Sequence, residues 1–379
     1  MDFALSEEQK RVKDMCRQFT DEVIAPRAAE VDRADDYPYD IIYRMAGLGM
    51  MGIPFPGEYG GSSGDWVSAM LCIEEISRGD AGLGFMLVVT ALCTHEIELF
   101  GSEEQKQRWL PSLVTGKRIG GFGLTEAGAG SDASAISCTA TLEDGEWVLN
   151  GRKQFISNMG LDNSSIVVIA AVSGENQKGK SITSSFVATK GTPGFTVGRS
   201  YDKLGLHSCS TNELIFEDCH LPLDCQLGET GRGLAQSLAM VQVGRIGIAA
   251  CGVGLAQACL DASLAYARER TQFGRSIIEF EGVSFKLADM AVAIELARLM
   301  YLKAAWLKDK GLPYTFEASA AKLYASEMAE KVASDAVQIH GGYGYMSDYA
   351  VSRYYKQAKV MQIVEGTSEV QRIVITRTL

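Results

Sequence analysis

The sequence has no apolar run long enough to cross a membrane. Its longest, Ala81 to Thr94 (AGLGFMLVVTALCT), falls short of the roughly 18 to 20 residues that span a bilayer, so no transmembrane helix is predicted. The N-terminal stretch MDFALSEEQKRVKDM lacks the basic start and apolar core of a secretory signal, and also the Arg- and Ser-rich character of a transit peptide. We therefore expect a cytoplasmic protein, or a mitochondrial matrix protein if the sequence is a processed form.

Basic charge and paired cysteines are also scarce. Lys and Arg number 36 against 47 Asp and Glu, and the resulting formal charge of −11 gives no long-range attraction for nucleic acid, so no such partner is expected. The nine cysteines are scattered and never spaced C-x-x-C, which predicts reduced thiols. The four histidines lie far apart, and Cys219, His220 and Cys225 fit no common zinc spacing and are better interpreted as a surface turn. No metal is predicted.

The hydrophobic period changes twice along the 379 residues, which are enough for two or three packed units. From Glu7 to about Gly116 apolar residues recur at helical spacing, from Phe122 to about Gly228 short β-branched runs alternate with turns, and after Gly233 long Ala-rich helical stretches follow. We predict an α+β chain with a helical domain over 1–119, a central β domain over 120–232 and a helical bundle over 233–379.

One formal motif conflicts with its surroundings. Gly174 to Ser181 (GENQKGKS) matches the phosphate-loop pattern G-x-x-x-x-G-K-S, which would indicate an ATPase. That loop needs a helix after it to bind phosphate, whereas SITSSFVATKGTPGF, which follows, is typical of a strand and a turn. We interpret the segment as a hairpin loop. The dinucleotide pattern G-x-G-x-x-G and the hydrolase elbow G-x-S-x-G are both absent from the sequence.

Two other segments could form a functional site. The loop Phe122 to Asp132 (FGLTEAGAGSD) offers glycines for close backbone approach and the hydroxyls of Thr125 and Ser131 for a polar or phosphorylated ligand, although it could also be a plain Gly-rich turn. Near the C-terminus, Glu365 follows apolar Ile363 and Val364, so its carboxylate could be desolvated and act as a base. The alternative for Glu365 is a role at a helix start.

Taken together, these residues resemble the acyl-CoA dehydrogenase family of FAD flavoproteins along essentially the whole chain. The resemblance rests on five segments in the family's order: FGLTEAGAGSD, NGRKQFISN at 150–158, YARERTQFG at 266–274, VQIHGGYGY at 337–345 and IVEGT at 363–367. It implies an N-terminal helical domain, a central β-barrel-like domain and a C-terminal four-helix bundle. This is the succession that the hydrophobic period predicts.

The resemblance also implies roles for individual residues. Glu365 matches the catalytic base, and three residues match substrate contacts, namely Ser131, Arg245 and Gly366. The FAD contacts within one subunit match Phe122, Leu124, Thr125, Gly130, Ser131, Phe155, Ile156, Ser157, Thr367 and Glu369. Positions that reach the FAD of a neighbouring subunit match Arg270, Gln272, Phe273, Gln338, Gly341 and Gly342. A guanidinium fork such as that of Arg270 suits a pyrophosphate, although an ordinary surface arginine is the alternative.

Four positions depart from what relatives often have. Gly244 stands where some relatives place the base, which leaves Glu365 as the candidate, and Glu281 stands where many have Gln near the neighbouring FAD. Val364 replaces a tyrosine, which predicts room for a branched or cyclic acyl group, and Gly84 replaces the arginine of glutaryl-type members. A dicarboxyl substrate is therefore disfavoured.

The function implied is FAD-dependent α,β-dehydrogenation of a short or medium uncharged acyl-CoA to a 2-enoyl-CoA, by a homotetramer that passes electrons to an electron-transferring flavoprotein. Two alternatives stay open. One is an acyl-CoA oxidase on the same fold, and the other is a non-catalytic acyl-CoA-binding scaffold.

Overall fold

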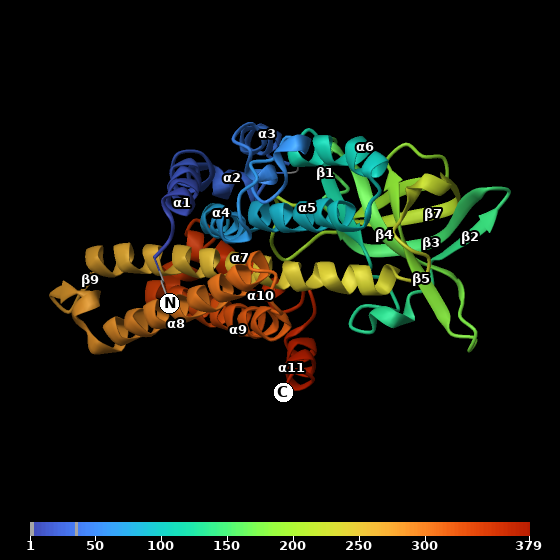
Figure 1. Cartoon of the computed structure of the whole chain (residues 1–379). Coiled ribbons are helices and arrows are strands. Elements are labelled where there is room, and N and C mark those ends of the chain that lie inside the picture. Colours follow the sequence, from blue (N-terminus) through green and yellow to red (C-terminus); the bar gives the residue numbers. More distant parts are fainter. Residues whose placement is uncertain (1–3, 35–36) are drawn as a thin grey trace.

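The computed structural model describes residues 4–34 and 37–379 and arranges them as helices, a sheet and further helices (Figure 1). The first helical group contains α1 (Glu7–Phe19), α2 (Ala28–Val31), α3 (Tyr39–Gly47), α4 (Trp66–Gly79), α5 (Ala81–Phe100) and α6 (Glu103–Val114). Helices α1 and α6 each begin with a capping box, in which a serine hydroxyl and a glutamine side chain satisfy backbone N–H groups reciprocally.

The middle of the chain forms one mixed sheet. Its strands are β1 (Ile119–Gly123), β2 (Thr139–Glu143), β3 (Glu146–Ser157), β4 (Ser164–Glu175), β5 (Ser181–Thr189), β6 (Phe195–Ser200), β7 (Thr211–Pro222) and β8 (Gln226–Leu227). The order is β6-β7-β3-β2-β4-β5-β8, and β1 pairs in parallel with β4. The sheet lies at one end of the long C-terminal helices (Figure 1).

Two local predictions for this region have opposite outcomes. The segment 176–180 connects β4 to antiparallel β5 as a hairpin loop, so the phosphate-loop match has no helix behind it and its interpretation as a loop is confirmed. The prediction of a surface turn at Cys219 and His220 is wrong. Both residues lie in β7, because pairing of Cys219 with Leu149 and of His220 with Val148 extends the strand beyond its local propensity.

The C-terminal residues form a bundle of α7 (Gly233–Glu269), α8 (Glu281–Asp309), α9 (Thr315–His340) and α10 (Ala350–Met361), followed by short α11 (Ser368–Thr376). A small hairpin of β9 (Thr271–Gln272) and β10 (Arg275–Ser276) joins α7 to α8. The fold predicted from sequence, with helical, β and four-helix-bundle parts in that order, is confirmed.

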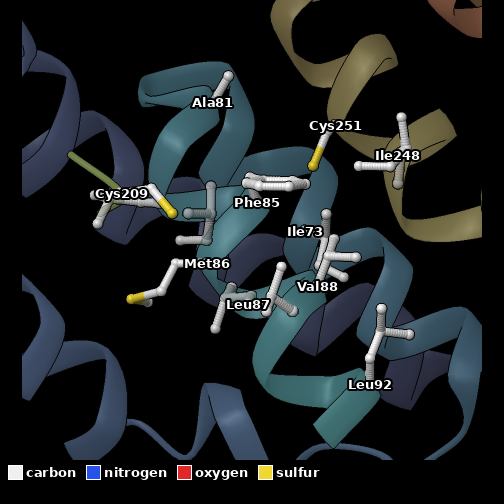
Figure 2. Packing of buried hydrophobic residues seen from close by; sticks show 14 of the residues in the cluster. Ile73, Ala81, Phe85, Met86, Leu87, Val88, Leu92, Cys209, Ile248 and Cys251 are labelled. Atoms are coloured by element: carbon white, nitrogen blue, oxygen red, sulfur yellow. The ribbon is translucent and has the colours of Figure 1, made fainter. Parts of the chain in front are cut away.

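Helices α4, α5 and α7 share one apolar core. Figure 2 shows Ile73 of α4, Phe85 and Val88 of α5, and Ile248 and Cys251 of α7 converging in it. Helices α5 and α7 are long and apolar enough to cross a membrane by length and composition, but 78% of the relevant window of each is buried inside the protein. Their apolar surface is therefore explained by the core. All nine cysteines are buried free thiols, as predicted.

Glu96 of α5 is a buried acid whose protonation should affect stability. One carboxyl oxygen accepts from the Ser185 hydroxyl at 2.7 Å, the other finds no partner among the described residues, and burial raises the pKa of Glu96 to about 7. Because the folded pKa lies above that of the unfolded chain, the neutral acid favours folding at low pH, and this contribution is lost as pH rises through about 7.

We therefore expect Glu96→Gln to become stabilising relative to the unsubstituted protein as pH rises, by up to about 3 kcal/mol, since the amide carries no charge to bury. The measurement is the free energy of unfolding of both proteins between about pH 5 and pH 9. A difference between the two that stays constant with pH would refute this assignment.

Candidate active site

Glu365 lies in the short connection between α10 and α11, where the backbone is left-handed. Its φ is +53° and that of Gly366 is +88°, and Thr367 then begins α11 by accepting a hydrogen bond from the N–H of Val370 at 3.3 Å. A left-handed glutamate is unfavourable in isolation, so its surroundings must stabilise it. They do so through the Gln371 amide, which donates to the carbonyls of Glu365 at 3.0 Å and of Gly366 at 2.8 Å.

The carboxylate of Glu365 lies against the backbone of α7. A Cβ atom placed on Gly244 would stand 2.6 Å from its Oε2 atom, so only glycine leaves the acid its room. Burial raises the pKa of Glu365 to about 7, while the positive charges of Arg245 and Lys322 act in the opposite direction. An acid with this pKa is ionised in about half of the molecules at neutral pH and suits proton abstraction.

Arg245 of α7 is a predicted substrate contact whose charge acts on this acid. It is 6% exposed, and its Nη1 donates to the Ser319 hydroxyl at 3.2 Å, while its Nε has no partner within the described part of the chain. Burial lowers the pKa of Arg245, and the charge of Glu365 counteracts this effect. A buried guanidinium with a free donor is available to an acceptor on a ligand.

The predicted flavin loop follows β1 and is held by a buried ion pair. Lys153 of β3 is fully buried, and its Nζ donates to Glu126 at 2.7 Å and to the carbonyl of Leu124 at 3.2 Å. Glu126 also accepts from the backbone of Ser137 at 2.7 Å and of Cys138 at 3.0 Å. Burial pushes the pKa of Glu126 upward, but the hydrogen bond and charge of Lys153 outweigh it and keep that pKa below the ordinary value.

The same loop presents an open face. A Cβ on Gly128 or Gly130 would meet no atom within 4 Å, and Ser131 is exposed. Thr125 is tied to β3 because its carbonyl accepts from the N–H of Gln154 at 2.8 Å. Phe155, which follows Gln154 in β3, has a φ of +59°, and the residue is 59% exposed. The remaining predicted contacts here, Phe122, Ile156 and Ser157, lie in β1 and at the end of β3.

A second group of predicted residues lines a cavity of about 460 Å³ where α7 and α9 end. Arg270, Gln272, Gly341 and Gly342 all face this cavity, whereas Gln338 and Phe273 are absent from its lining. Tyr266, His340 and Tyr343 also line it and were missed by the sequence prediction. Hairpin β9–β10 lies at the opposite end of the molecule from the sheet (Figure 1), so one chain cannot bring both groups to a single ligand.

The third predicted group is brought together by α7, α9 and α11. The contacts described above bring together four predicted residues, namely Arg245, Glu365, Gly366 and Thr367. Glu369, in contrast, is exposed in the first turn of α11. Glu281 is exposed at the start of α8. Within the described residues, no group of three or more His, Cys, Asp or Glu side chains could hold a metal ion.

The structure combines an acid suited to take a proton, a separate open loop, and a cavity lined by arginine and glycine. This combination fits an oxidoreductase that works with a bound nucleotide cofactor. The chain belongs to the acyl-CoA dehydrogenase family. Its models match residues 6–117 (acyl-CoA dehydrogenase, N-terminal domain), 121–219 (middle domain) and 231–379 (C-terminal domain). The protein is accordingly an enzyme of the acyl-CoA dehydrogenase class with FAD as its cofactor.

Relatives of known name cover the full chain. Probable acyl-CoA dehydrogenase YngJ of Bacillus subtilis (strain 168) is 48% identical over 381 residues, with 100% of both proteins covered. The structure of butyryl-CoA dehydrogenase from Megasphaera elsdenii has a TM-score of 0.96 and 40% identity, covering 100% of this chain and 99% of that one. A chain solved in work on the electron transferring flavoprotein of Acidaminococcus fermentans has a TM-score of 0.96 and 44% identity, with 100% and 99% coverage.

Sequence reasoning missed the residues that support the predicted contacts. Lys153, Lys322 and Gln371 are all fully buried, and Lys322 and Gln371 donate to the same carbonyl, that of Gly366. A signal existed for Lys322, because Ala318 and Ala325, its neighbours at helical spacing, are apolar and lie on the buried face of α9. Lysine on such a face indicates a charge with a buried partner.

The ion pair of Lys153 and Glu126 gives a prediction for cofactor retention. Lys153→Met leaves the Glu126 carboxylate buried without its cation, and we expect a cost of about 3 to 5 kcal/mol in stability and release of FAD at lower temperature than from the unsubstituted protein. The measurement is thermal unfolding together with the fluorescence of released flavin. The double variant Lys153→Met/Glu126→Gln, which buries no charge, should recover part of the loss. Unchanged flavin retention in the single variant would contradict the prediction.

Proposed function

We propose that this protein oxidises a short or medium, uncharged acyl-CoA to the corresponding 2-enoyl-CoA, with Glu365 as the base. The observation that supports this most is the position of Glu365: a carboxyl against Gly244 whose pKa is raised to about 7 by burial. A thioester withdraws electrons from its α-carbon, so a carboxylate held there can remove the α-proton. FAD, when bound, supplies the acceptor for the hydride that leaves the β-carbon.

The other residues have supporting roles in this proposal. The loop with Leu124, Thr125, Gly130 and Ser131, next to Phe155–Ser157, would hold the flavin, because it combines an open glycine backbone with hydroxyls and a rigid anchor on β3. Backbone N–H groups of the left-handed connection at Glu365 and Gly366 would bind the thioester oxygen. Arg245, with its free Nε, would bind a polar part of the CoA ester.

The substrate class is inferred from the apolar helices near the base. Residues 84–94 of α5 include no basic side chain for a distal carboxylate. Gly247 follows Gly244 by one turn of α7, and a Cβ there would lie 2.7 Å from a Val88 methyl, so Val88 fills the space on that side. This packing supports a limited acyl length. The smaller Val364, which is half-buried beside the base, leaves room for branching.

Completion of the cofactor site requires a second copy of the chain. The cavity with Arg270, Gln272, Gly341 and Gly342 lies at the far end of the bundle from the flavin loop, so it would bind the FAD of a neighbouring subunit (Figure 1). Large apolar side chains exposed along α8 support burial against other copies; they are Phe285, Val292, Leu296, Leu299 and Trp306. We expect a homotetramer, which light scattering on the purified holoenzyme can measure.

The test of this function uses the flavin absorbance of purified protein under anaerobic conditions. A panel of straight, branched, cyclic and dicarboxyl acyl-CoA esters is added, and we expect bleaching by short uncharged members and none by glutaryl-CoA. Admission of air then separates two fates of the electrons. Slow reoxidation that an electron-transferring flavoprotein accelerates supports a dehydrogenase, whereas fast reoxidation with peroxide would indicate an oxidase. Protein that binds no FAD would favour a scaffold.

A further inference from the structure

We propose that Lys322 is a positioning residue for the base: its ammonium fixes the peptide that follows Glu365 and supplies the second positive charge that keeps the carboxylate available for catalysis. The inference rests on the proposed role of Glu365 and adds a residue outside the predicted site. Lys322 lies in the middle of α9, fully buried, with its side chain directed at the connection between α10 and α11.

The geometry shows what Lys322 holds. Its Nζ donates to the carbonyl of Gly366 at 2.7 Å, and the Gln371 amide donates to the same carbonyl at 2.8 Å and to that of Glu365 at 3.0 Å. These donors satisfy the backbone carbonyls of a connection whose φ angles, +53° at Glu365 and +88° at Gly366, are left-handed. Because only one of the two residues is a glycine, this backbone depends on such partners.

The charged groups that act on Glu365 and Lys322 come from three helices, α7, α9 and α11. Arg245 of α7 and Lys322 of α9 are the two cations that act on Glu365. Lys322 itself faces Glu365, Glu369 of α11 and Glu327 of its own helix, which favour its charged form, and Arg245, which opposes it. Burial has the largest effect and lowers the pKa of Lys322 to about 8. Lys322 is therefore charged around neutral pH, in the range where Glu365 titrates.

Loss of this charge should make Glu365 harder to ionise. The lysine charge lowers the pKa of Glu365, so its removal raises that pKa further, and the base is then protonated over a wider range of pH. We expect Lys322→Met to shift the titration of Glu365 upward by about one pH unit. Lys322→Gln keeps an N–H donor for the Gly366 carbonyl but no charge, and the same upward shift is expected.

The experiment has one readout that needs no turnover. The infrared band of the protonated Glu365 carboxyl, identified by its disappearance in Glu365→Gln, is titrated in the holoenzyme of the unsubstituted protein, Lys322→Met, Lys322→Gln and Lys331→Met. Lys331 is an exposed lysine of the same helix, paired with Asp335 at 2.7 Å, and serves as the matched control. The second readout is the pH dependence of flavin bleaching by butyryl-CoA.

The expected result is an upward shift in both Lys322 variants and none in Lys331→Met. Circular dichroism and thermal unfolding check that each variant is folded, and Lys322→Gln decides the question if the methionine variant is not. A midpoint within about 0.3 pH units of the unsubstituted protein in the folded variants would overturn the role of Lys322. Failure of the proposed function looks different, because the unsubstituted protein would then show no bleaching with any acyl-CoA.

Discussion

Replacement of Glu365 by glutamine should reduce the rate of flavin bleaching by about three orders of magnitude while FAD and substrate still bind. The amide has nearly the shape of the acid, so the space beside Gly244 stays filled, but it cannot accept the α-proton. The measurement is anaerobic rapid mixing of the variant with butyryl-CoA, with the flavin absorbance followed over time. Retained FAD is checked by the ratio of flavin to protein absorbance.

A second variant separates the chemistry of Glu365 from its position. Glu365→Asp keeps a carboxylate but withdraws it by one methylene, so we expect a rate between those of the glutamine variant and the unsubstituted protein. A glutamine variant that bleaches at a near-normal rate would remove Glu365 from the reaction, and Gly244 offers no replacement on α7.

Gly244→Ala should have the next largest effect. The added methyl would lie 2.6 Å from Oε2 of Glu365, closer than contact distance, so the carboxylate must turn away from its position. A displacement of about 1 Å at a reacting group costs on the order of a hundredfold in rate, and this is the loss of kcat/KM that we expect. Alanine is otherwise the better helix former, so the loss should occur without a large fall in stability.

The matched control is Gly252→Ala, two turns further along α7. Its new Cβ would lie 3.1 Å from the carbonyl oxygen of Ala325, which is a tight contact that does not involve Glu365. We expect modest destabilisation and a rate within a few-fold of the unsubstituted protein. Equal losses of activity in both variants would show that a general disturbance of α7, and not the place of the acid, limits the reaction.

The fold could be predicted because the hydrophobic period changes where the architecture changes. Helical spacing ends before β1 begins at Ile119 and returns where α7 begins at Gly233. The phosphate-loop match at 174–181 was also resolved correctly from the strand character that follows it. The turn expected at Cys219 was wrong because pairing with β3, distant in sequence, determines that segment.

The chemistry of the site was less accessible from sequence. Glu365 could be chosen as the base from its apolar neighbours and from the resemblance, but its pKa is set by burial, which raises it, against two cations from α7 and α9, which lower it. Lys322 and Gln371 do not belong to any of the segments that support the resemblance, and their importance arises from hydrogen bonds to backbone carbonyls. Such bonds are set by tertiary packing and leave no local pattern.

The most direct test of the central claim is the pH dependence of kcat/KM for the unsubstituted enzyme, which reports the ionisation of the free base. We expect kcat/KM with butyryl-CoA to rise through a single ionisation near pH 7, the pKa of Glu365, to a plateau at higher pH, and we expect the residual rate of Glu365→Gln to lack this step. A profile of the unsubstituted enzyme that is flat across this range, or the same step in the glutamine variant, would contradict it.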